Sequence, residues 1–564
     1  MTATGALGAK VERWVPGVRA ARAYRPAWLR SDLVAGLVLA AILVPQGMAY
    51  AELAGLPAVT GLYTTIACLV GYAIFGPSRV LVLGPDSSVS PLIFAAITPL
   101  LVTDDPGQAV VLAGMLAILV GLIEVGLGVG KLGFVADLLS SEVQVGYMNG
   151  LAVTIVVGQL PKLFGFSTDA DTFGAEVREF FAHLDQRVTA ALVVGVTCLV
   201  VLLVLPRVTK KIPAVLVAVV GATIVSAVWN LDAHGVVTVG SLPAGLPRPS
   251  LPWTSFSDVG PLMLAAVGIV LVSLTDTIAT ASAFAARRGD ELEPNQEMIG
   301  VGAANLASGF LQGFAVSTSG SRTAVAEQSG AKSQVAGLVG ASILVVLLLF
   351  FNSLLADLPQ STLAAVVIAA ALSLVDLGAL RKYARVRPSS LILSLVATLG
   401  VIVFGVLEGI VIAIFLAVLL FFRRSWWPHG AVLGRAADAE GWHGIEDRAD
   451  AAEVDGVLVY RWEAPLFFAN AGAFRQQIRR LVRERDPAWV VIQCEAITDI
   501  DVTAAAMLED LDEELNAAGR HMAFVELRTR LRELVRRHGL FETLDRDHFY
   551  PSIETALADI ADGG

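Results

Sequence analysis

The stretch Leu83-Gly84-Pro85-Asp86-Ser87-Ser88-Val89-Ser90 interrupts a long apolar run with a proline and several polar residues. A second stretch, Ala315-Val316-Ser317-Thr318-Ser319-Gly320-Ser321-Arg322, interrupts the run again much later in the chain. Each break precedes an apolar segment that is too short to span a bilayer. Polar, non-helical backbone occurs at membrane depth only where protein covers it or where it lines a wet cavity. A matched pair of such breaks therefore predicts a transporter's substrate site.

The composition divides the chain into a membrane part and a soluble part. Of the 564 residues, 55% are hydrophobic and only 16% are charged, whereas about 25% is usual for soluble proteins. The apolar excess lies between Leu33 and Phe422, and the chain becomes ordinary from about Asp438. We expect a basic N-terminal arm over 1–30, a transmembrane domain over 31–424, a linker over 425–450 and a soluble domain over 451–564. The three cysteines lie far apart and predict neither disulfides nor a metal site.

The hydropathy pattern predicts about 14 membrane segments. Their expected spans are 33–51, 58–75, 87–100, 108–130, 143–160, 187–206, 212–229, 260–286, 297–313, 320–331, 334–352, 361–378, 389–404 and 406–422. An even number of segments places both termini on the same side. Bases gather in the N-terminal arm and in alternate loops, for example at Arg207, Arg287 and Arg381. The positive-inside rule then predicts cytoplasmic termini, with the chain in the plasma (inner) membrane.

The positions of the two breaks indicate an internal repeat. The first break opens the third segment and the second opens the tenth, seven segments later. Because seven is odd, two such halves have opposite orientations in the bilayer. The pattern predicts a seven-plus-seven inverted repeat in which two half-helices enter from opposite faces and meet near the midplane.

Two facing half-helix starts would form an anion site, because unsatisfied N–H groups and the helix dipoles point toward the ligand. Hydroxyl donors are expected from Ser87, Ser88, Ser319 and Ser321. Arg322 would add a fixed positive charge near the membrane interior. The alternative is that Arg322 pairs structurally with Glu327 or Asp86.

Two acids are candidates for the coupling cation. Asp86 either caps its half-helix or is protonated during transport, which would join proton movement to anion binding. Asp276 lies inside the long apolar segment 260–286, and Thr280 shares its helix face. A carboxylate with hydroxyls can hold Na⁺, and a lone carboxylate can carry H⁺. The alternative for Asp276 is a buried ion pair with Arg322.

The first membrane segment contains Val44-Pro45-Gln46-Gly47-Met48-Ala49-Tyr50. Pro45 frees a backbone carbonyl, and Gly47 permits close packing. Gln46 and Tyr50 are four residues apart and can face one cavity. The alternative is that both serve helix–helix hydrogen bonding and packing.

Together these motifs resemble the sulfate permease (SulP) family of anion transporters. The matching stretches run in order along nearly the whole chain: Asp32-Leu33-Val34-Ala35-Gly36-Leu37, Val44 to Ala51, Gly61-Leu62-Tyr63, Gly84-Pro85, Pro294-Asn295-Gln296-Glu297 and Gly320-Ser321-Arg322-Thr323-Ala324-Val325. The resemblance implies 14 helices in a seven-plus-seven repeat, with a core domain that moves against a gate domain in an elevator-like manner. It implies an anion pocket formed by Gln46, Tyr50, Ser87, Ser321 and Arg322.

The resemblance assigns the coupling cation to Asp276, beside Thr280. The Asp-Thr form of that segment resembles the Na⁺-coupled bicarbonate branch of the family, in which Asp276 would be a Na⁺ ligand. The Gln46 and Arg322 stretches resemble sulfate members instead. The substrate and the coupling ion therefore stay open at this point.

The tail reads as a small α/β domain, because strand and helix patterns alternate. Strands are expected at 457–460, 489–493 and 522–525, and helices at 473–483 and 504–518. The tail resembles a STAS domain, which implies a dimerisation and regulatory module and a homodimeric protein. In this family of domains a Ser or Thr after an Asp at a helix start is phosphorylated, which corresponds to Thr503. Thr503 as a plain N-cap is the alternative that we favour.

The sequence thus predicts a secondary active transporter of sulfate or bicarbonate, coupled to H⁺ or Na⁺, rather than an enzyme. Its expected partners are a small inorganic anion, the coupling cation, the lipid bilayer and a second copy of the chain, with no cofactor and no nucleic acid. A C4-dicarboxylate symporter or an anion exchanger is an alternative. A membrane-anchored anion sensor that signals through the STAS domain is an alternative of another class.

Overall fold

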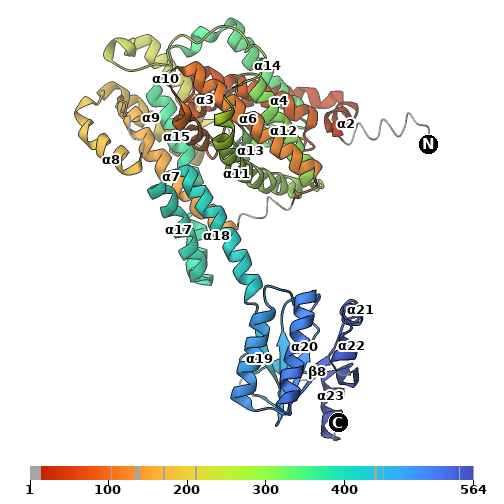
Figure 1. The fold of residues 1–564 in the computed structure, drawn as a ribbon. Coiled ribbons are helices and arrows are strands. Elements are labelled where there is room, and N and C mark those ends of the chain that lie inside the picture. The colour runs from red at the N-terminus through yellow and green to blue at the C-terminus, as the bar shows by residue number, and fades with distance from the viewer. Residues whose placement is uncertain are drawn as a thin grey trace. The chain divides into compact units, whose positions relative to one another are not determined.

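The computed structural model describes residues 14–102, 105–133, 140–168, 172–209, 213–253, 255–436, 441–448, 450–544 and 546–562. Residues 1–13 of the expected N-terminal arm lie outside the described residues. The chain forms two compact units, Met1–Ala417 and Val418–Gly564. The first unit is helical and the second contains a sheet (Figure 1).

Each of the expected membrane segments coincides with a helix. The long helices are α3 Leu29–Leu53, α4 Ala58–Phe75, α6 Pro106–Val129, α7 Ser141–Phe164, α9 Thr189–Val208, α10 Ala214–Trp229, α11 Phe256–Arg288, α12 Pro294–Phe310, α14 Val335–Phe350, α15 Gln360–Leu374, α17 Pro388–Phe404 and α18 Val406–Trp426. The two segments after the breaks are the short helices α5 Ser90–Ile97 and α13 Gly320–Gln328. Within the described residues, seven helices are long and apolar enough to cross a bilayer. Helices α2 Pro16–Arg22, α8 Phe173–Ala182 and α16 Leu377–Val386 lie between or before these segments.

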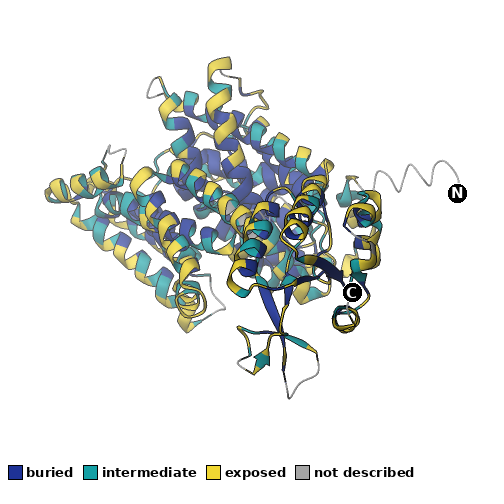
Figure 2. Ribbon diagram, turned by 60° about the horizontal axis from the view of Figure 1, so that its bottom comes forward, coloured by how far each residue is buried: buried dark blue, intermediate teal, exposed yellow. Residues whose placement is uncertain are grey.

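The membrane helices pack in two groups. The first group contains α3, α4, α5, α6, α11, α12, α13 and α14, and the second contains α7, α9, α10, α15 and α17. The groups meet where α3 packs against α10 and α15. Burial is concentrated in the centre of the helical unit (Figure 2). Helices α9, α10 and α17 expose many apolar side chains, such as Val200, Ile224 and Leu399, as expected for surfaces that face lipid.

The two breaks pair with each other as strands. β1 Leu83–Gly84 lies antiparallel to β2 Ser317–Thr318, with Leu83 opposite Thr318 and Gly84 opposite Ser317. The pairing explains how backbone without helix is tolerated inside the helical unit, since each break satisfies polar groups of the other. Antiparallel pairing is the arrangement that two inverted halves would give.

The C-terminal unit is an α/β domain, as the sequence predicts. The sheet runs in the order β4-β3-β6-β7-β8-β9, and β5 also pairs with β3. The strands are β3 Gly430–Ala436, β4 Trp442–Gly444, β5 Ala451–Ala452, β6 Val457–Trp462, β7 Trp489–Gln493, β8 His521–Val525 and β9 Phe549–Tyr550, and β6 to β9 are parallel. One face packs on α19 Ala471–Arg485, α20 Val502–Ala517, α21 Thr529–Arg537 and α22 Leu540–Thr543. Helix α23 Ile553–Ala561 packs on the other.

One boundary differs from the expectation. The stretch 425–450, expected as a linker, contains β3, which pairs with β6 from Gly430 opposite Trp462 to Leu433 opposite Val459. Gly430 and Gly434 interrupt the apolar pattern of this strand, so its sequence does not stand out from a linker. Residues 437–440 and 449 of this stretch lie outside the described part of the chain.

Candidate functional site

A cavity of about 920 Å³ lies between the two groups of membrane helices. One side is formed by the first group and carries most of the polar residues: Gln46, Tyr50, Asp86, Ser87, Asp276, Thr280, Thr318, Ser319, Ser321 and Arg322. The other side comes from the second group and is mainly apolar, for example Met148, Leu202 and Val366. The structure therefore gathers most of the expected site residues on a single group of helices.

Helix α3 supplies Gln46 and Tyr50, and the packing behind it sets their direction. A Cβ atom on Gly61 of α4 would lie 1.8 Å from the backbone oxygen of Gly47, so α3 and α4 touch along their backbones there. The cavity lining includes Gln46 and Tyr50 but neither of these two glycines. Tyr50 is buried beside Ser87.

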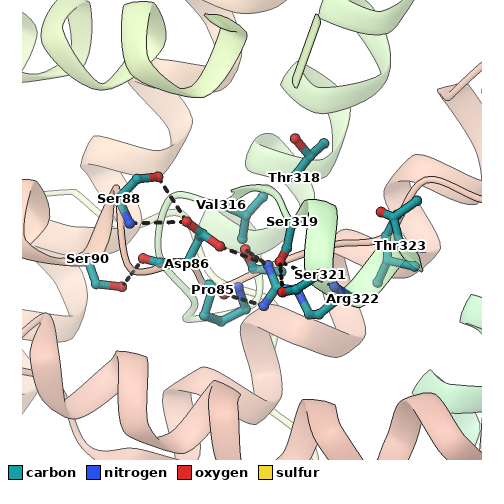
Figure 3. Close-up of polar contacts among 12 residues, drawn as sticks. Pro85, Asp86, Ser88, Ser90, Val316, Thr318, Ser319, Ser321, Arg322 and Thr323 are labelled. Atoms are coloured by element: carbon teal, nitrogen blue, oxygen red, sulfur yellow. Dashed lines mark hydrogen bonds and ion pairs between the residues drawn. The ribbon is translucent and has the colours of Figure 1, made fainter. Parts of the chain in front are cut away.

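The first break is organised by Asp86. Its Oδ1 accepts hydrogen bonds from the backbone N–H of Ser88 at 3.1 Å and from the Ser88 hydroxyl at 2.9 Å. Its backbone oxygen accepts from the hydroxyl of Ser90 at 2.8 Å (Figure 3). These bonds form an Asx-type turn ahead of the helix. The N-cap of α5 is Val89, which has no side-chain capping bond, so the prediction that Asp86 caps its half-helix is wrong. Ser87 lines the cavity, whereas Ser88 is buried against Asp86.

The second break presents two hydroxyls. Ser319 is the N-cap of α13, and its Oγ accepts from the backbone N–H of Arg322 at 3.5 Å. The hydroxyls of Ser319 and Ser321 lie 3.0 Å apart, and both residues line the cavity. The N-terminus of a nine-residue helix therefore opens onto the cavity beside two hydroxyl groups that can donate to an anion.

Arg322 reaches across to the first break. Its guanidinium donates to the backbone oxygen of Pro85 and, at 3.3 Å, to that of Gly84 (Figure 3). One nitrogen lies 3.5 Å from Oδ2 of Asp86, and the Arg322 side chain is only 1% exposed. The structure thus shows the Asp86 pair that the sequence leaves open, while Glu327 pairs with Arg288 instead, at 2.9 Å.

Asp276 and Thr280 of α11 line the cavity next to the breaks. Oδ1 of Asp276 accepts from Nε2 of Gln144 at 3.3 Å, which is a contact from α7 in the second helix group. Asp276 also lies near Ser88 and Asp86. The ion pair that the structure gives Arg322 is with Asp86, so the proposed pairing of Asp276 with Arg322 is wrong for this conformation.

Several residues at the site carry no distinctive signal in the sequence. Gln144 and Asp376 line the cavity from the second helix group, and they can be recognised only once that group is placed. Thr318 contacts Thr277, with 3.3 Å between their hydroxyl oxygens.

Glu124, in the C-terminal part of α6, forms a fully buried network behind the second break. It accepts from Ser273 at 3.0 Å and from Asn305 at 2.7 Å. The Asn305 oxygen in turn accepts from the backbone N–H of Val316 at 2.8 Å. Glu124 therefore orients the amide that holds Val316, immediately before β2.

In the C-terminal unit Thr503 is exposed on the first turn of α20. The N-cap of that helix is Asp501, whose Oδ1 accepts from the backbone N–H of Ala504 at 2.8 Å. The interpretation of Thr503 as the N-cap is therefore wrong, because the carboxylate of Asp501, two positions earlier, takes the capping position.

A helical membrane unit with paired half-helices around a polar cavity, joined to an α/β domain, defines a membrane transporter with a soluble appendage. The comparisons with known proteins agree. The sequence pattern of the sulfate permease family matches residues 29–397, and that of the STAS domain matches residues 448–556. A probable sulfate transporter of Mycobacterium tuberculosis (strain CDC 1551 / Oshkosh) is 40% identical over 547 residues, which cover 96% of this chain and 97% of the relative.

Two solved structures share the fold. Murine solute carrier 26 family member A9, an anion transporter in the inward-facing state, matches with a TM-score of 0.89 at 22% identity, covering 100% of this chain and 96% of its own. The transmembrane domain of the cyanobacterial bicarbonate transporter BicA matches with a TM-score of 0.61 at 22% identity, covering 70% of this chain and 98% of its own. The chain belongs to the sulfate permease family, and it is an anion transporter with a C-terminal STAS domain rather than an enzyme.

Proposed function

We propose that the protein is a secondary active transporter of sulfate or bicarbonate, coupled to H⁺ or Na⁺. The observation that carries this proposal is the convergence of two half-helix starts, several hydroxyls and Asp276 in one cavity. The relatives support the choice of anion, since one is named a probable sulfate transporter and another a bicarbonate transporter.

The anion is held by neutral donors rather than by a free cationic side chain. The charge of Arg322 is offset by Asp86, and its Nη1 and Nη2 donate to Pro85 and Gly84, while its buried Nε has no partner among the described residues. What remains for the anion is the partial positive charge of the helix starts, together with hydroxyls of Ser87, Ser319 and Ser321 and the side chains of Gln46 and Tyr50. Arg322 acts through position, since it fixes the first break against the second.

Asp276 carries the coupling cation. It lines the cavity beside Thr280 and contacts the neutral amide of Gln144. Within the described residues, the Asp276 carboxylate forms no ion pair, and Arg322 pairs with Asp86 instead. An acid at membrane depth in that state binds a proton or a cation. When Na⁺ is the coupling ion, the Asp276 carboxylate and the Thr280 hydroxyl are the side chains that we assign to it.

The carrier moves as an elevator. The half-helices, α3 and α11 belong to one helix group, and the other group contributes a largely apolar wall. A bound anion can therefore travel with the first group, without exchanging its ligands, while the second group stays in place. The seven-plus-seven inverted repeat proposed for the chain fits this division, because the paired breaks come one from each half.

The cavity opens toward the cytoplasm in this conformation. Its lining includes Pro206 at the end of α9, next to Arg207, and Asp376, shortly before Arg381. These basic loops are cytoplasmic by the positive-inside rule, which also favours cytoplasmic termini. The same proposal assigns the chain to the plasma membrane. The likeness to a structure in the inward-facing state supports the same assignment.

The STAS domain serves dimerisation and regulation in this proposal. Thr503 is exposed at the start of α20 and is therefore reachable by a kinase, with Asp501 as the cap beside it. We keep phosphorylation of Thr503 as the regulatory proposal.

Uptake of labelled anions into proteoliposomes tests the function. We expect sulfate or bicarbonate to accumulate when an inward Na⁺ or H⁺ gradient is imposed, and not when the gradient is absent. Accumulation of a C4-dicarboxylate instead, or uptake only against a trapped counter-anion, would favour the symporter or exchanger alternatives. Binding of an anion without flux under any gradient would favour the sensor and contradict the proposal.

A further inference from the structure

Helix α16, which links α15 to α17, separates its charged and apolar residues onto two faces. Arg381, Lys382 and Arg385 fall within one sector of less than half the circumference at 100° per residue. The remaining circumference is apolar apart from one hydroxyl and consists of Leu377, Ala379, Leu380, Tyr383, Ala384 and Val386. Leu377 is 56% exposed and Val386 is 75% exposed, so part of this apolar face is not covered by the protein.

The basic face is exposed and carries no compensating acid. Arg381, Lys382 and Arg385 are exposed, as is Arg387 just beyond the helix, and no acidic residue occurs between Leu377 and Arg387. None of these four bases takes part in an ion pair with the described residues. The positive-inside rule explains why a cytoplasmic loop is basic, but it does not explain why the bases share one face of a helix.

The start of α16 is tied to the transport cavity. Asp376 caps the helix by accepting from the backbone N–H of Ala379 at 2.8 Å. The backbone N–H of Asp376 donates to Asn149 of α7 at 3.0 Å. Asp376 itself lines the cavity. A ligand that fixes α16 therefore also fixes a residue of the cavity wall and its connection to α7.

We propose that α16 is a binding site for anionic lipid headgroups of the cytoplasmic leaflet. Its exposed apolar side chains enter the interface while the three bases face the phosphates, which is the arrangement of an amphipathic helix that lies in the membrane plane. The next residues support this placement, because Pro388 begins the membrane helix α17 directly afterwards. An acidic soluble protein would match the charge of the basic face, but the exposed apolar side chains of Leu377 and Val386 would then stay in water.

Through Asp376, the bound headgroups stabilise the second helix group, against which the first group moves. This stabilising effect on transport rests on the proposed transport function, whereas lipid binding itself does not.

Lipid binding is therefore measured first, on the full chain carrying Arg381→Gln, Lys382→Gln and Arg385→Gln. The matched control is Arg528→Gln, Arg530→Gln and Arg532→Gln, which removes three exposed arginines at the start of α21 in the C-terminal unit.

Both variants and the unmodified protein are placed in vesicles of phosphatidylcholine with or without phosphatidylglycerol that carries a spin label. We expect the unmodified protein and the control to immobilise the labelled lipid, and the α16 variant to bind it on the order of 100-fold more weakly. Unchanged lipid binding by the α16 variant would overturn the proposal. An equal loss in the control would also overturn it, since the effect would then come from net charge alone.

Sulfate or bicarbonate uptake is then compared in the same two lipid mixtures. We expect phosphatidylglycerol to stimulate uptake by the unmodified protein and the control, and not by the α16 variant. If the α16 variant loses lipid binding as expected but none of the three proteins transports anions in either lipid mixture, the proposed function is wrong and the lipid site is retained. If the α16 variant still binds the labelled lipid but no longer associates with a second copy of the chain, the basic face is a protein interface and the proposal is wrong.

Discussion

The guanidinium of Arg322 lies 3.5 Å from the carboxylate of Asp86, so the only ion pair at the two breaks joins one break to the other within the described part of the chain. The same guanidinium holds the backbone oxygens of Gly84 and Pro85. With the strand pairing of β1 and β2, this pair makes the two half-helix starts one connected structure. The site is therefore preorganised before an anion enters it.

Arg322→Ala should weaken anion binding more than cation dependence, and it should also destabilise the membrane unit. Removal of Arg322 leaves Asp86 without its counter-charge and takes a donor from the backbone oxygens of Gly84 and Pro85, which costs about 3–5 kcal/mol. Thermal unfolding in detergent and sulfate affinity of the purified variant measure both effects. The double variant Asp86→Ala/Arg322→Ala should recover part of the stability, because no unpaired charge remains. Unchanged anion affinity in Arg322→Ala would remove Arg322 from the site.

Asp276→Asn should abolish gradient coupling while the fold stays intact. The amide keeps the size of the carboxylate and can still meet Gln144, but it can neither take up a proton nor attract Na⁺. In proteoliposomes the variant should no longer accumulate the anion against its gradient, although it should still exchange or equilibrate the anion. Its elution profile in detergent should be unchanged. Glu408→Gln, at an exposed acid of α18, is the matched control. Normal concentrative uptake by Asp276→Asn would refute the coupling role.

Glu124→Gln should disturb the second break without touching the cavity. The amide offers one oxygen and one N–H group in place of two carboxylate oxygens, so either Ser273 or Asn305 must change its hydrogen bond, at a cost of about 1–3 kcal/mol. Since Asn305 holds Val316, we expect a higher KM for the anion with gradient coupling retained. Initial uptake rates over a range of anion concentrations measure this. A variant with unchanged KM and unchanged thermal stability would show that the network does not position β2.

Asp501→Ala should loosen the first turn of α20, whereas Thr503→Ala should not. Loss of an N-cap costs about 0.5–2 kcal/mol, and Asp501 also accepts from the backbone N–H of Phe468 at 2.8 Å. Hydrogen exchange of the full chain should show faster exchange at 502–505 in the first variant only. Equal protection in both variants would mean that the cap contributes little.

Much of the fold follows from the sequence, because apolar composition dictates where helices cross a bilayer and where buried strands lie. The positions of the two breaks can also be predicted from the sequence, since prolines, glycines and serines are costly in an apolar membrane helix. The sequence does not decide the partner of Arg322, because a long side chain can reach several acids and only the crossing of the two breaks selects Asp86. Gln144 and Asp376 could not be predicted, because their place at the cavity depends on how the second helix group meets the first.

The pairing of Leu83 with Thr318 also bears on how the chain is made. At 5–20 residues per second, the ribosome produces the second break roughly 10–50 s after the first. During that interval the first break has reached the membrane without its strand partner or its arginine. Nascent chains that end before Thr318 should therefore be held by the insertion machinery or degraded, and the completed chain should become protease-resistant only after its second half has been inserted.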